Sequence, residues 1–275
     1  MSGRDAATAM PSPQPLAALR FSVLEAHGVR HAATLRTRGA SRPPYHYGNL
    51  GFAVPDDPQA VVANREAAAA AAGVTLDALV VGQQVHGDRI AAVGPADRGR
   101  GARGRDALPA TDALITDSPE VALLVLTADC AALVLYAPDV RALGVAHLGW
   151  RGTVARLAEK MVDALAQRYG ADPRRLVGAL APSIGPCCYG VGEEVIDAVR
   201  SRFRSPDALL IRRAAGVAFD IPGAILQQLA DAGVAPAAIE RSPLCTSCRT
   251  DLFYSHRAER GRTGRTGLIA ALPAV

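Results

Sequence analysis

Three side chains that could hold a metal ion follow apolar stretches of the chain: His86, Cys130 and His147. Zinc prefers nitrogen and sulfur ligands, and catalytic zinc usually keeps three protein ligands and one open position. The three residues are far apart in the sequence, and their spacing alone is no metal motif. Two core histidines and a buried cysteine are the alternative interpretation of the spacing.

Anion binding is the second chemistry that the sequence offers. The net charge is +4, and Lys160 is the only lysine, so arginine supplies almost all positive charge. A guanidinium group can grip phosphate with two parallel hydrogen bonds. Arg151 precedes the clearest helical pattern of the chain, where backbone N–H groups could also face an anion. Asp129, next to Cys130, could orient a ligand, act as a base or cap a turn.

The candidate ligands lie where buried strands are expected to end. Short apolar runs predict core strands on both sides of Thr127–Cys130 and ahead of His147. Functional groups commonly lie at such strand ends. The predicted strands are 29–35, 79–85, 121–126, 133–136, 142–146, 177–180, 253–256 and 268–272.

Helical periodicity is clearest over 154–169, where apolar residues recur three and four positions apart. Thr153 is expected to cap this helix, and Gly170 to end it. Asp57 and Pro58 predict the start of another helix, which should stop at Gly73. Further helices are expected over 193–203 and 221–231.

These elements predict an α/β (α+β) fold, a single-domain layered sandwich with mixed sheets flanked by helices. Hydrophobic residues make up 49% of the chain, enough for a sizeable core without disulfides. Residues 1–20 are expected to be a disordered lead-in and 21–275 a single catalytic domain. No apolar stretch is long enough to span a bilayer, and the N-terminal segment lacks the apolar part of a secretory signal. We therefore expect a cytoplasmic protein that does not enter the membrane.

Several short motifs resemble the laccase-domain family, once described as multicopper polyphenol oxidases. Members are also described as purine nucleoside phosphorylases and peptidoglycan editing factors. The resemblance runs from about Arg38 to the C-terminus. The matching segments surround the three candidate ligands and include Gln83–Gly87, Thr127–Cys130, Ala146–Gly152, Tyr45, Asn49–Gly51, Asn64–Arg65, Gly185–Tyr189, Tyr254–Arg257 and Thr263–Arg265.

The resemblance implies that both histidines and Cys130 bind zinc beside a nucleoside pocket. It implies phosphorolysis of adenosine, inosine and methylthioadenosine, with deamination of adenosine as a side activity. Zinc could activate water for deamination or stabilise charge on the departing base. The phosphate and substrate candidates are Arg38, Asn49 and Arg65 in matching segments, together with Arg151.

The chain departs from the family pattern at three places. Phe52–Asp57 stands where the family usually has His-Val-Gly-Asp-Asp, and Gly190 stands where it has Glu. Ala131 and Ala132 replace a proline that usually follows the cysteine. None of these differences removes a candidate ligand, but the first two leave the substrate preference open.

Three other functions are alternatives to that of a nucleoside enzyme. A copper oxidase needs paired His-x-His motifs, whereas this chain has six histidines and no such pair. Copper is therefore expected only as a substitute at the zinc site. A metal-free cysteine hydrolase of peptidoglycan precursors would use Cys130 as nucleophile and His147 or His86 as base.

Nucleic acid is the third alternative, through the arginine- and glycine-rich segment 94–109. The segment is short and has no aromatic residue for base stacking, which argues against this partner. Four further cysteines, at positions 187, 188, 245 and 248, are expected to be buried thiols. Adjacent cysteines seldom bind one tetrahedral metal together, so a structural zinc site is the less favoured interpretation. The sequence indicates no oligomeric state.

Overall fold

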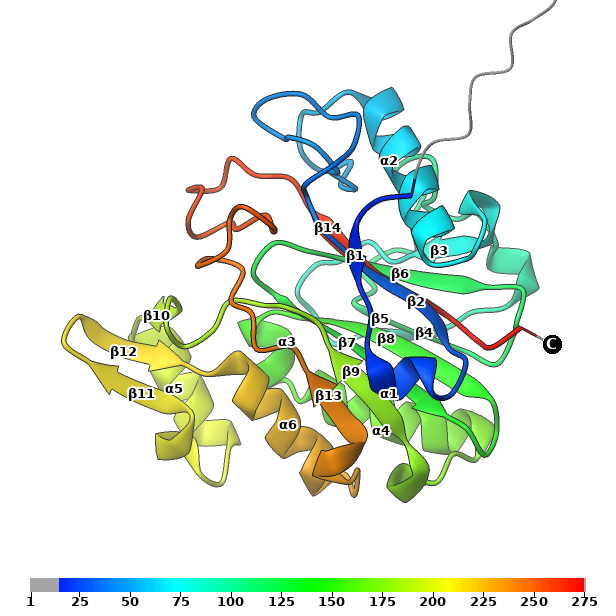
Figure 1. Ribbon diagram of the computed structural model, residues 1–275. Coiled ribbons are helices and arrows are strands. Elements are labelled where there is room, and N and C mark those ends of the chain that lie inside the picture. Colours follow the sequence, from blue (N-terminus) through cyan, green and yellow to red (C-terminus); the bar gives the residue numbers. More distant parts are fainter. Residues whose placement is uncertain (1–14, 275) are drawn as a thin grey trace, which may run out of the picture.

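Two mixed sheets stacked on each other form the centre of the molecule (Figure 1). The computed structural model describes residues 15–274. Helices cover the outer face of each sheet, so the described chain has a helix–sheet–sheet–helix order of layers. The predicted layered α/β sandwich with mixed sheets is confirmed. Among residues 15–274, no helix has the length and apolar character needed to cross a bilayer.

The first sheet has five strands in the order β1-β2-β14-β6-β3. All neighbours are antiparallel except β3, which runs parallel to β6. Its strands are β1 (Ala18–Leu19), β2 (Arg30–Thr34), β3 (Leu79–Val81), β6 (Ala122–Thr127) and β14 (Thr266–Ala271).

The second sheet has six strands in the order β13-β9-β7-β8-β5-β4. Its outer pairs, β13 with β9 and β4 with β5, are parallel, and its inner pairs are antiparallel. Its strands are β4 (Ile90–Ala92), β5 (Ala113–Thr116), β7 (Ala131–Ala137), β8 (Ala142–Leu148), β9 (Val177–Leu180) and β13 (Ile239–Arg241). A separate small sheet holds β10 (Gly190–Val191), β11 (Leu210–Arg213) and β12 (Gly216–Phe219).

The helices divide between the two outer faces. In Figure 1, α2 lies above the five-stranded sheet, and α4 and α6 lie below the six-stranded one. The helices are α1 (Ser22–Glu25), α2 (Pro58–Ala71), α3 (Trp150–Val154), α4 (Leu157–Tyr169), α5 (Glu193–Arg202) and α6 (Ile221–Asp231). Short 3-10 turns occupy Leu76–Ala78, Pro95–Asp97, Pro173–Arg175, Pro206–Ala208 and Pro236–Ala238.

Alternation along β7 shows how its sequence produces the layers. Val134 and Tyr136 pack into the core between the sheets, whereas Leu133 and Leu135 pack against the helices. Successive side chains of a strand point to opposite faces, so a strand that is apolar throughout must be covered on both. This explains why β7 reads as an unbroken apolar run.

Two predicted strands differ from the structure. The strand predicted over 79–85 ends at Val81, because Gln84 pairs through its side chain rather than its backbone with Leu126. The segment Phe253–His256 is not a strand but part of a turn-rich loop. There Tyr254 donates a hydrogen bond from its hydroxyl to the carbonyl of Tyr45, a partner outside any sheet.

The helix predicted from Val154 is also different, because it is split in two. Arg156 has a left-handed φ of 61° between α3 and α4, which interrupts the helical hydrogen bonding. Thr153 lies inside α3, where its hydroxyl donates to the carbonyl of Gly149, and is not a cap. Gly170 ends α4 in a left-handed conformation, as predicted.

The disordered lead-in was predicted over residues 1–20, of which residues 1–14 lie outside the described chain. Residues 15–20 are ordered, which corrects the prediction for this stretch. Leu16 is buried, and Ala18 and Leu19 pair with β2. Burial of Leu16 and the backbone pairing offset the entropy of ordering these residues. The folded part of the chain therefore begins before residue 21.

Candidate active site

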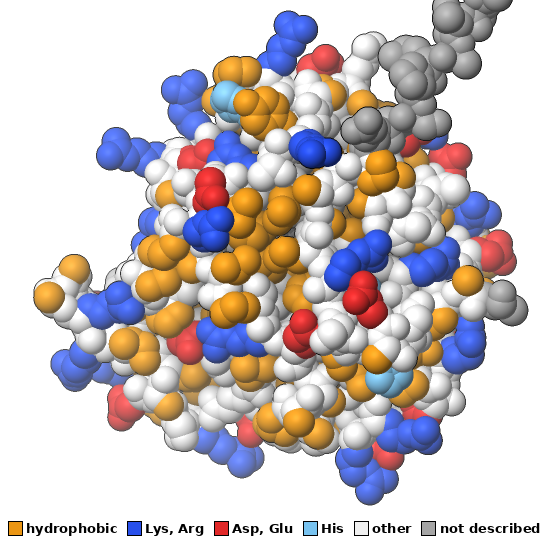
Figure 2. Space-filling view, in the orientation of Figure 1, with side chains coloured by type: hydrophobic (Ala, Val, Ile, Leu, Met, Phe, Trp, Pro, Cys, Tyr) orange, Lys and Arg blue, Asp and Glu red, His pale blue; other side chains and the backbone are white. Residues whose placement is uncertain are grey.

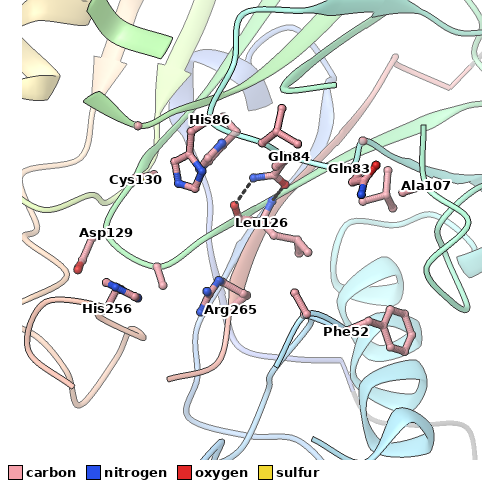
Figure 3. A pocket seen from close by; sticks show the side chains of 18 of the residues that line it. Phe52, Gln83, Gln84, His86, Ala107, Leu126, Asp129, Cys130, His256 and Arg265 are labelled. Atoms are coloured by element: carbon pink, nitrogen blue, oxygen red, sulfur yellow. Dashed lines mark hydrogen bonds between the residues drawn. The ribbon is translucent and has the colours of Figure 1, made fainter. Parts of the chain in front are cut away.

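His86, Cys130 and His147 meet at one end of the sandwich. One donor atom from each residue lies within 4.8 Å of the donors of the other two. The imidazole rings of His86 and His147 are 4.9 Å apart and meet edge to face. Figure 3 shows His86 beside Cys130 at one side of a cavity, with Arg265 across from them. Three residues far apart in the sequence could therefore share one metal ion.

Each of the three comes from a different part of the two sheets. Cys130 lies in the loop in which the chain passes from β6 of one sheet to β7 of the other. His147 is near the end of β8, opposite Ala132 of β7, and its side chain follows Val145 onto the face between the sheets. His86 lies in the loop after β3. The site therefore depends on the stacking of both sheets.

Asp112 holds the two histidines in place. Its Oδ1 accepts a hydrogen bond from His147 Nδ1 at 2.9 Å. The same carboxylate accepts the backbone N–H groups of Val85, His86 and Gly87 at 2.9–3.1 Å. A ligating histidine commonly donates its second ring N–H to a carboxylate, which fixes its tautomer and orientation. With Nδ1 used in this way, Nε2 of His147 is left to face Cys130.

Two residues of the site have unusual backbone conformations. His86 has a φ of 60° and Asp129 a φ of 85°, both in the left-handed region. A non-glycine residue there costs roughly 1–2 kcal/mol, and such conformations cluster at functional sites. At Asp129 the conformation is supported by hydrogen bonds from Thr246 Oγ1 and the backbone N–H of Arg257, both at 2.7 Å.

Gly149 leaves the space that the ligands occupy. A Cβ atom at this position would lie 2.9 Å from Cδ2 of His86 and 3.1 Å from Sγ of Cys130. Carbon contacts this short force a shift, and packed interiors accommodate added atoms poorly. A glycine is therefore required before α3, because the side chains of His86 and Cys130 lie too close to its Cα to leave room for a Cβ atom.

Cys130 and His147 influence each other's protonation. Although burial raises the pKa of Cys130, the neighbouring His147 and His86 lower it to about 6. Burial lowers the pKa of His147, but Cys130 and Asp112 outweigh it and raise that pKa to about 9. Without a metal, the two side chains would form a thiolate–imidazolium pair near neutral pH. A thiolate is the form in which cysteine acts as a nucleophile or binds metal.

A cavity of about 900 Å³ opens in front of the three candidate ligands. This volume is within the range of pockets that enclose small-molecule ligands. Gln84 is held against the cavity wall by hydrogen bonds in both directions with the backbone of Leu126, each 2.8 Å long (Figure 3). Aromatic, amide and cationic side chains complete the lining: Phe52, Gln83, Trp150, Tyr189, His256, Arg65, Arg105, Arg151, Arg257 and Arg265.

Comparison with known proteins identifies the family. Residues 30–272 match the family described as multi-copper polyphenol oxidoreductase laccase. The chain belongs to this laccase family. A purine nucleoside phosphorylase of the family, YlmD from Bacillus subtilis, is 37% identical over 235 residues, which cover 84% of each chain. The adenosine deaminase RL5, from an unknown prokaryotic organism, is 35% identical over 87% of this chain and 92% of its own.

The crystal structure of YlmD from Geobacillus stearothermophilus has the same fold. It superposes with a TM-score of 0.86 at 37% identity, over 90% of this chain and 93% of its own. The YfiH protein of Bacillus licheniformis is also similar, with a TM-score of 0.85 and 36% identity over 90% and 98% of the two chains. The resemblance inferred from the short motifs is thus confirmed, and relatives within the laccase family are named as enzymes of purine nucleosides.

The donor set in this laccase-family chain fits a single metal ion. Two imidazoles and a thiolate suit zinc, and the open side toward the cavity matches a catalytic site with a free coordination position. The same donors also suit copper, which binds such ligands more tightly. The absence of any His-x-His pair from the sequence does not fit the copper cluster of a multicopper oxidase.

The four predicted phosphate or substrate residues lie in different places. Arg65 and Arg151 line the cavity, whereas Arg38 and Asn49 are not among its lining residues. Arg65 is buried and donates hydrogen bonds to the carbonyls of three residues, Leu50, Gly101 and Ala102.

Arg151 is exposed, stacks on Trp150 with Cζ 4.1 Å from the ring centre and pairs with Glu194. Arg38 is exposed on the loop after β2. Asn49 is buried, and its Oδ1 accepts the backbone N–H of Arg265 at 2.8 Å, so it contacts the cavity wall from behind.

Several residues of the site were not assigned from the sequence. A carboxylate before a strand, such as Asp112, gave no signal that separates it from an ordinary turn residue. His256, Arg257 and Arg265 also line the cavity. They belong to segments that match the family motifs, but no role was assigned to them from the sequence. Those motifs were the available signal for these three residues. Figure 2 shows that cationic and acidic side chains are interspersed on the face drawn there, not gathered into a basic band.

Proposed function

We propose that this protein is a zinc-dependent purine nucleoside phosphorylase. Its substrates would be adenosine, inosine and methylthioadenosine, and deamination of adenosine would be a side activity. The main support is the convergence of His86, Cys130 and His147 at the wall of a nucleoside-sized cavity. The names of the relatives supply the substrate class.

His86, Cys130 and His147 would hold the zinc ion in this proposal. Bound zinc would supply Lewis-acid stabilisation of charge that develops on the departing base, or on a water in deamination. The protein's own contribution is to fix the geometry. Asp112 holds the His147 ring and the His86 loop, and Gly149 leaves room beside them.

Phosphate would be bound by arginines on the cavity wall. Arg65 is buried, and its guanidinium donates to three carbonyl groups. Arg151 and Arg257 are exposed residues of the cavity lining and are better placed to bind the anion. Arg265 also lines the cavity, although its Nη1 already donates to the carbonyls of Thr263 and Gly264. Arg257 donates from Nη1 to the carbonyl of Gly190 and lies 5.1 Å from the ring centre of Tyr189. These contacts hold its side chain at the cavity lining, where it would bind phosphate.

The purine base needs a flat apolar surface and polar groups at its edge. Phe52, Trp150 and Tyr189 provide aromatic surface in the cavity, and Gln83 provides an amide that can both donate and accept. Since site residues come from both large sheets, we also propose that residues 21–275 act as one catalytic domain.

The test is incubation with adenosine or inosine, with and without inorganic phosphate, followed by identification of products. Ribose 1-phosphate and free base are expected only when phosphate is present. Inosine formed from adenosine without phosphate would show the deaminase activity. Cys130→Ala and His86→Ala are expected to lower phosphorolysis by at least about 100-fold, because a direct ligand should matter at least as much as its supporting residues.

His27→Ala is the matched control, since His27 is exposed on the turn after α1. It should keep wild-type turnover. Undiminished phosphate-dependent release of base by Cys130→Ala would overturn the proposal.

One observation favours a second candidate function. Cys130, His147 and Asp112 are arranged in series, with Asp112 bonded to His147 Nδ1 and His147 facing the thiol. This order of groups is that of a cysteine hydrolase, which would use Cys130 as nucleophile and His147 as base, for example on a peptidoglycan precursor. Chelator-treated protein that stays fully active and is inactivated by thiol alkylation would favour this alternative.

A further inference from the structure

A second cluster of metal-binding side chains lies outside the site already described. It consists of Cys187, Cys188, Cys245 and Cys248, whose sulfur atoms all lie within 4.8 Å of one another. The sequence favoured buried thiols, but only Cys245 is buried. Cys188 is half-buried, and Cys187 and Cys248 are exposed. The expectation of four buried thiols was therefore wrong.

The distances between the sulfur atoms are close to those of a tetrathiolate metal site. Sγ of Cys248 lies 3.6 Å from Sγ of Cys187 and 3.4 Å from Sγ of Cys188. A tetrahedral zinc ion with Zn–S bonds of about 2.3 Å separates its sulfur ligands by about 3.8 Å. The cluster needs only small side-chain adjustments to reach this geometry.

The topology of the second sheet brings the two cysteine pairs together. Strands β9 and β13 are parallel neighbours, so their C-terminal ends, and the loops that follow them, lie at the same end of the sheet. Cys187 and Cys188 lie in the loop after β9, and Cys245 and Cys248 in the loop after β13. A parallel bridge between Ser183 and Cys245 joins the two loops.

The second loop has a recognised ligand spacing. Cys245 and Cys248 form a Cys-x-x-Cys pair, a spacing common in structural zinc sites. The backbone N–H of Gly185 donates to Sγ of Cys245 at 3.2 Å. Such an N–H···S bond stabilises sulfur in its ligating form. The backbone thus supports the sulfur that lies deepest in the cluster.

A disulfide explains the arrangement less well. Cys187 and Cys188 both approach Cys248, so a disulfide at Cys248 could use only one of them. The observed separations are also far longer than a bond of about 2.05 Å. One tetrahedral ion uses all four sulfurs.

We propose that these four cysteines bind a second, structural zinc ion. The site has no open coordination position, which is typical of structural rather than catalytic zinc. This proposal does not depend on the nucleoside activity or on the occupancy of the His86 site.

The cysteine cluster has a direct connection to the cavity wall. Thr246, between the two ligands of the second loop, donates to Asp129, which precedes Cys130. Ile184 of the first loop donates its backbone N–H to the carbonyl of Asp129 at 2.8 Å, and Tyr189 lines the cavity. The second zinc would therefore cross-link two loops that form the wall behind Asp129 and Cys130.

The test measures zinc content of the full-length protein, purified with a reductant, for wild type and two double variants. We expect about two zinc ions per wild-type chain and about one in the His86→Ala/Cys130→Ala protein. The Cys245→Ser/Cys248→Ser protein should also keep about one, at the other site. Cobalt added to zinc-depleted His86→Ala/Cys130→Ala protein should show intense thiolate-to-cobalt charge transfer.

Zinc-free His86→Ala/Cys130→Ala protein that shows no such cobalt spectrum would overturn the proposal. A disulfide found by mass in the reductant-treated protein, with no zinc bound, would do the same. If only the proposed zinc site at His86, Cys130 and His147 were wrong, the wild type would hold one zinc ion. The His86→Ala/Cys130→Ala protein would keep this ion, and the Cys245→Ser/Cys248→Ser protein would lose it. The two failures are therefore distinguishable.

The double variant could fail to fold, so a milder pair of variants is also used. Cys187→Ser changes an exposed ligand and should weaken zinc binding at least about 10-fold in competition with a chelator. Ser247→Ala, between the Cys245 and Cys248 ligands, is the matched control and should leave the affinity unchanged. Equal zinc affinity of Cys187→Ser and Ser247→Ala would contradict ligation by all four cysteines.

Discussion

His147 donates from Nδ1 to Asp112 over 2.9 Å, and the same carboxylate accepts three backbone N–H groups of the loop that holds His86. One buried residue therefore sets the positions of two candidate metal ligands that come from different sheets. Burial raises the pKa of Asp112, but these hydrogen bonds outweigh it, and the net pKa is lowered. The group is therefore a carboxylate at neutral pH.

Replacement of this carboxylate should weaken the metal site. In Asp112→Asn, one oxygen becomes an NH2 group, which cannot accept hydrogen bonds from His147 and the loop amides together. We expect zinc affinity to fall about 10- to 100-fold, because that is the usual effect of removing a partner of a ligating histidine. Competition with a fluorescent chelator measures it.

Asp163→Asn is the control, because Asp163 is exposed on α4. It should bind zinc as the wild type does. Wild-type affinity in Asp112→Asn would mean that the His147 ring is held by its packing alone.

Gly149→Ala should damage the site through contact rather than backbone strain. Its φ of −75° suits alanine, but the added Cβ would meet His86 and Cys130 at 2.9 and 3.1 Å. We expect zinc affinity and turnover to fall at least about 10-fold, with a loss of stability of about 1–3 kcal/mol. Chelator competition and urea unfolding report the two effects.

Gly94→Ala provides the comparison, since a Cβ there meets no atom within 4 Å. If both alanine variants bound zinc equally well, the prediction that a side chain at position 149 disturbs the metal site would be wrong.

The candidate ligands could be named from the sequence because they follow apolar runs and lie in motifs that resemble a known family; their spacing alone did not favour a metal site. A polar residue of metal-binding type at the end of an apolar run is visible in the sequence, as at Cys130 and His147. Helix α6 and strand β9 match their predicted bounds, because turn residues or caps mark both ends. Asp112 escaped prediction because its partners lie in two segments far from it in the sequence.

Other differences between the predicted and the observed elements have the same cause, because they depend on contacts between residues far apart in the sequence. The segment around Tyr254 has the apolar pattern of a strand, yet its side chains are buried in a loop. Gln84 occupies a position in a predicted strand, but its side chain replaces the backbone as the partner of Leu126. Periodicity reports which residues are buried and cannot report what pairs with them.

Arg65 should prove important for stability. Its guanidinium donates to the carbonyls of Leu50, Gly101 and Ala102, which joins α2 to the loop after the second 3-10 turn. Cζ also lies 4.5 Å from the ring centre of Phe52. Arg65→Leu leaves buried carbonyls without donors, at a cost of roughly 1–3 kcal/mol each.

We expect the free energy of unfolding of Arg65→Leu to fall by at least about 2 kcal/mol, as measured by urea titration. Arg98→Leu, which removes an exposed arginine paired with Glu120, should change it by less than about 0.5 kcal/mol. If Arg65→Leu kept wild-type stability but raised the KM for phosphate, its guanidinium would serve the anion and not the fold.

His31 should make stability depend on pH through its neutral ring. The side chain is fully buried, its Nε2 accepts the backbone N–H of Phe21 at 2.9 Å, and its Nδ1 donates to the carbonyl of Val29 at 2.9 Å. Protonation would break the bond to Phe21. Burial lowers the pKa of His31 below its usual 6.5, and the charge of Arg20 lowers it further against the opposing bond to Val29.

Because the folded state binds the proton less tightly than the unfolded state, stability rises with pH between the two pKa values. The contribution of His31 is complete above about pH 6.5 and is lost as pH falls through the lowered pKa of the folded state. In urea titrations from pH 5 to 7.5, the wild type should lose up to about 1.4 kcal/mol per pH unit more than His31→Gln on acidification. His27→Gln, at an exposed histidine, should keep the wild-type slope. Parallel pH curves for His31→Gln and the wild type would show that His31 is protonated equally in both states, which the bond from Phe21 to Nε2 does not allow.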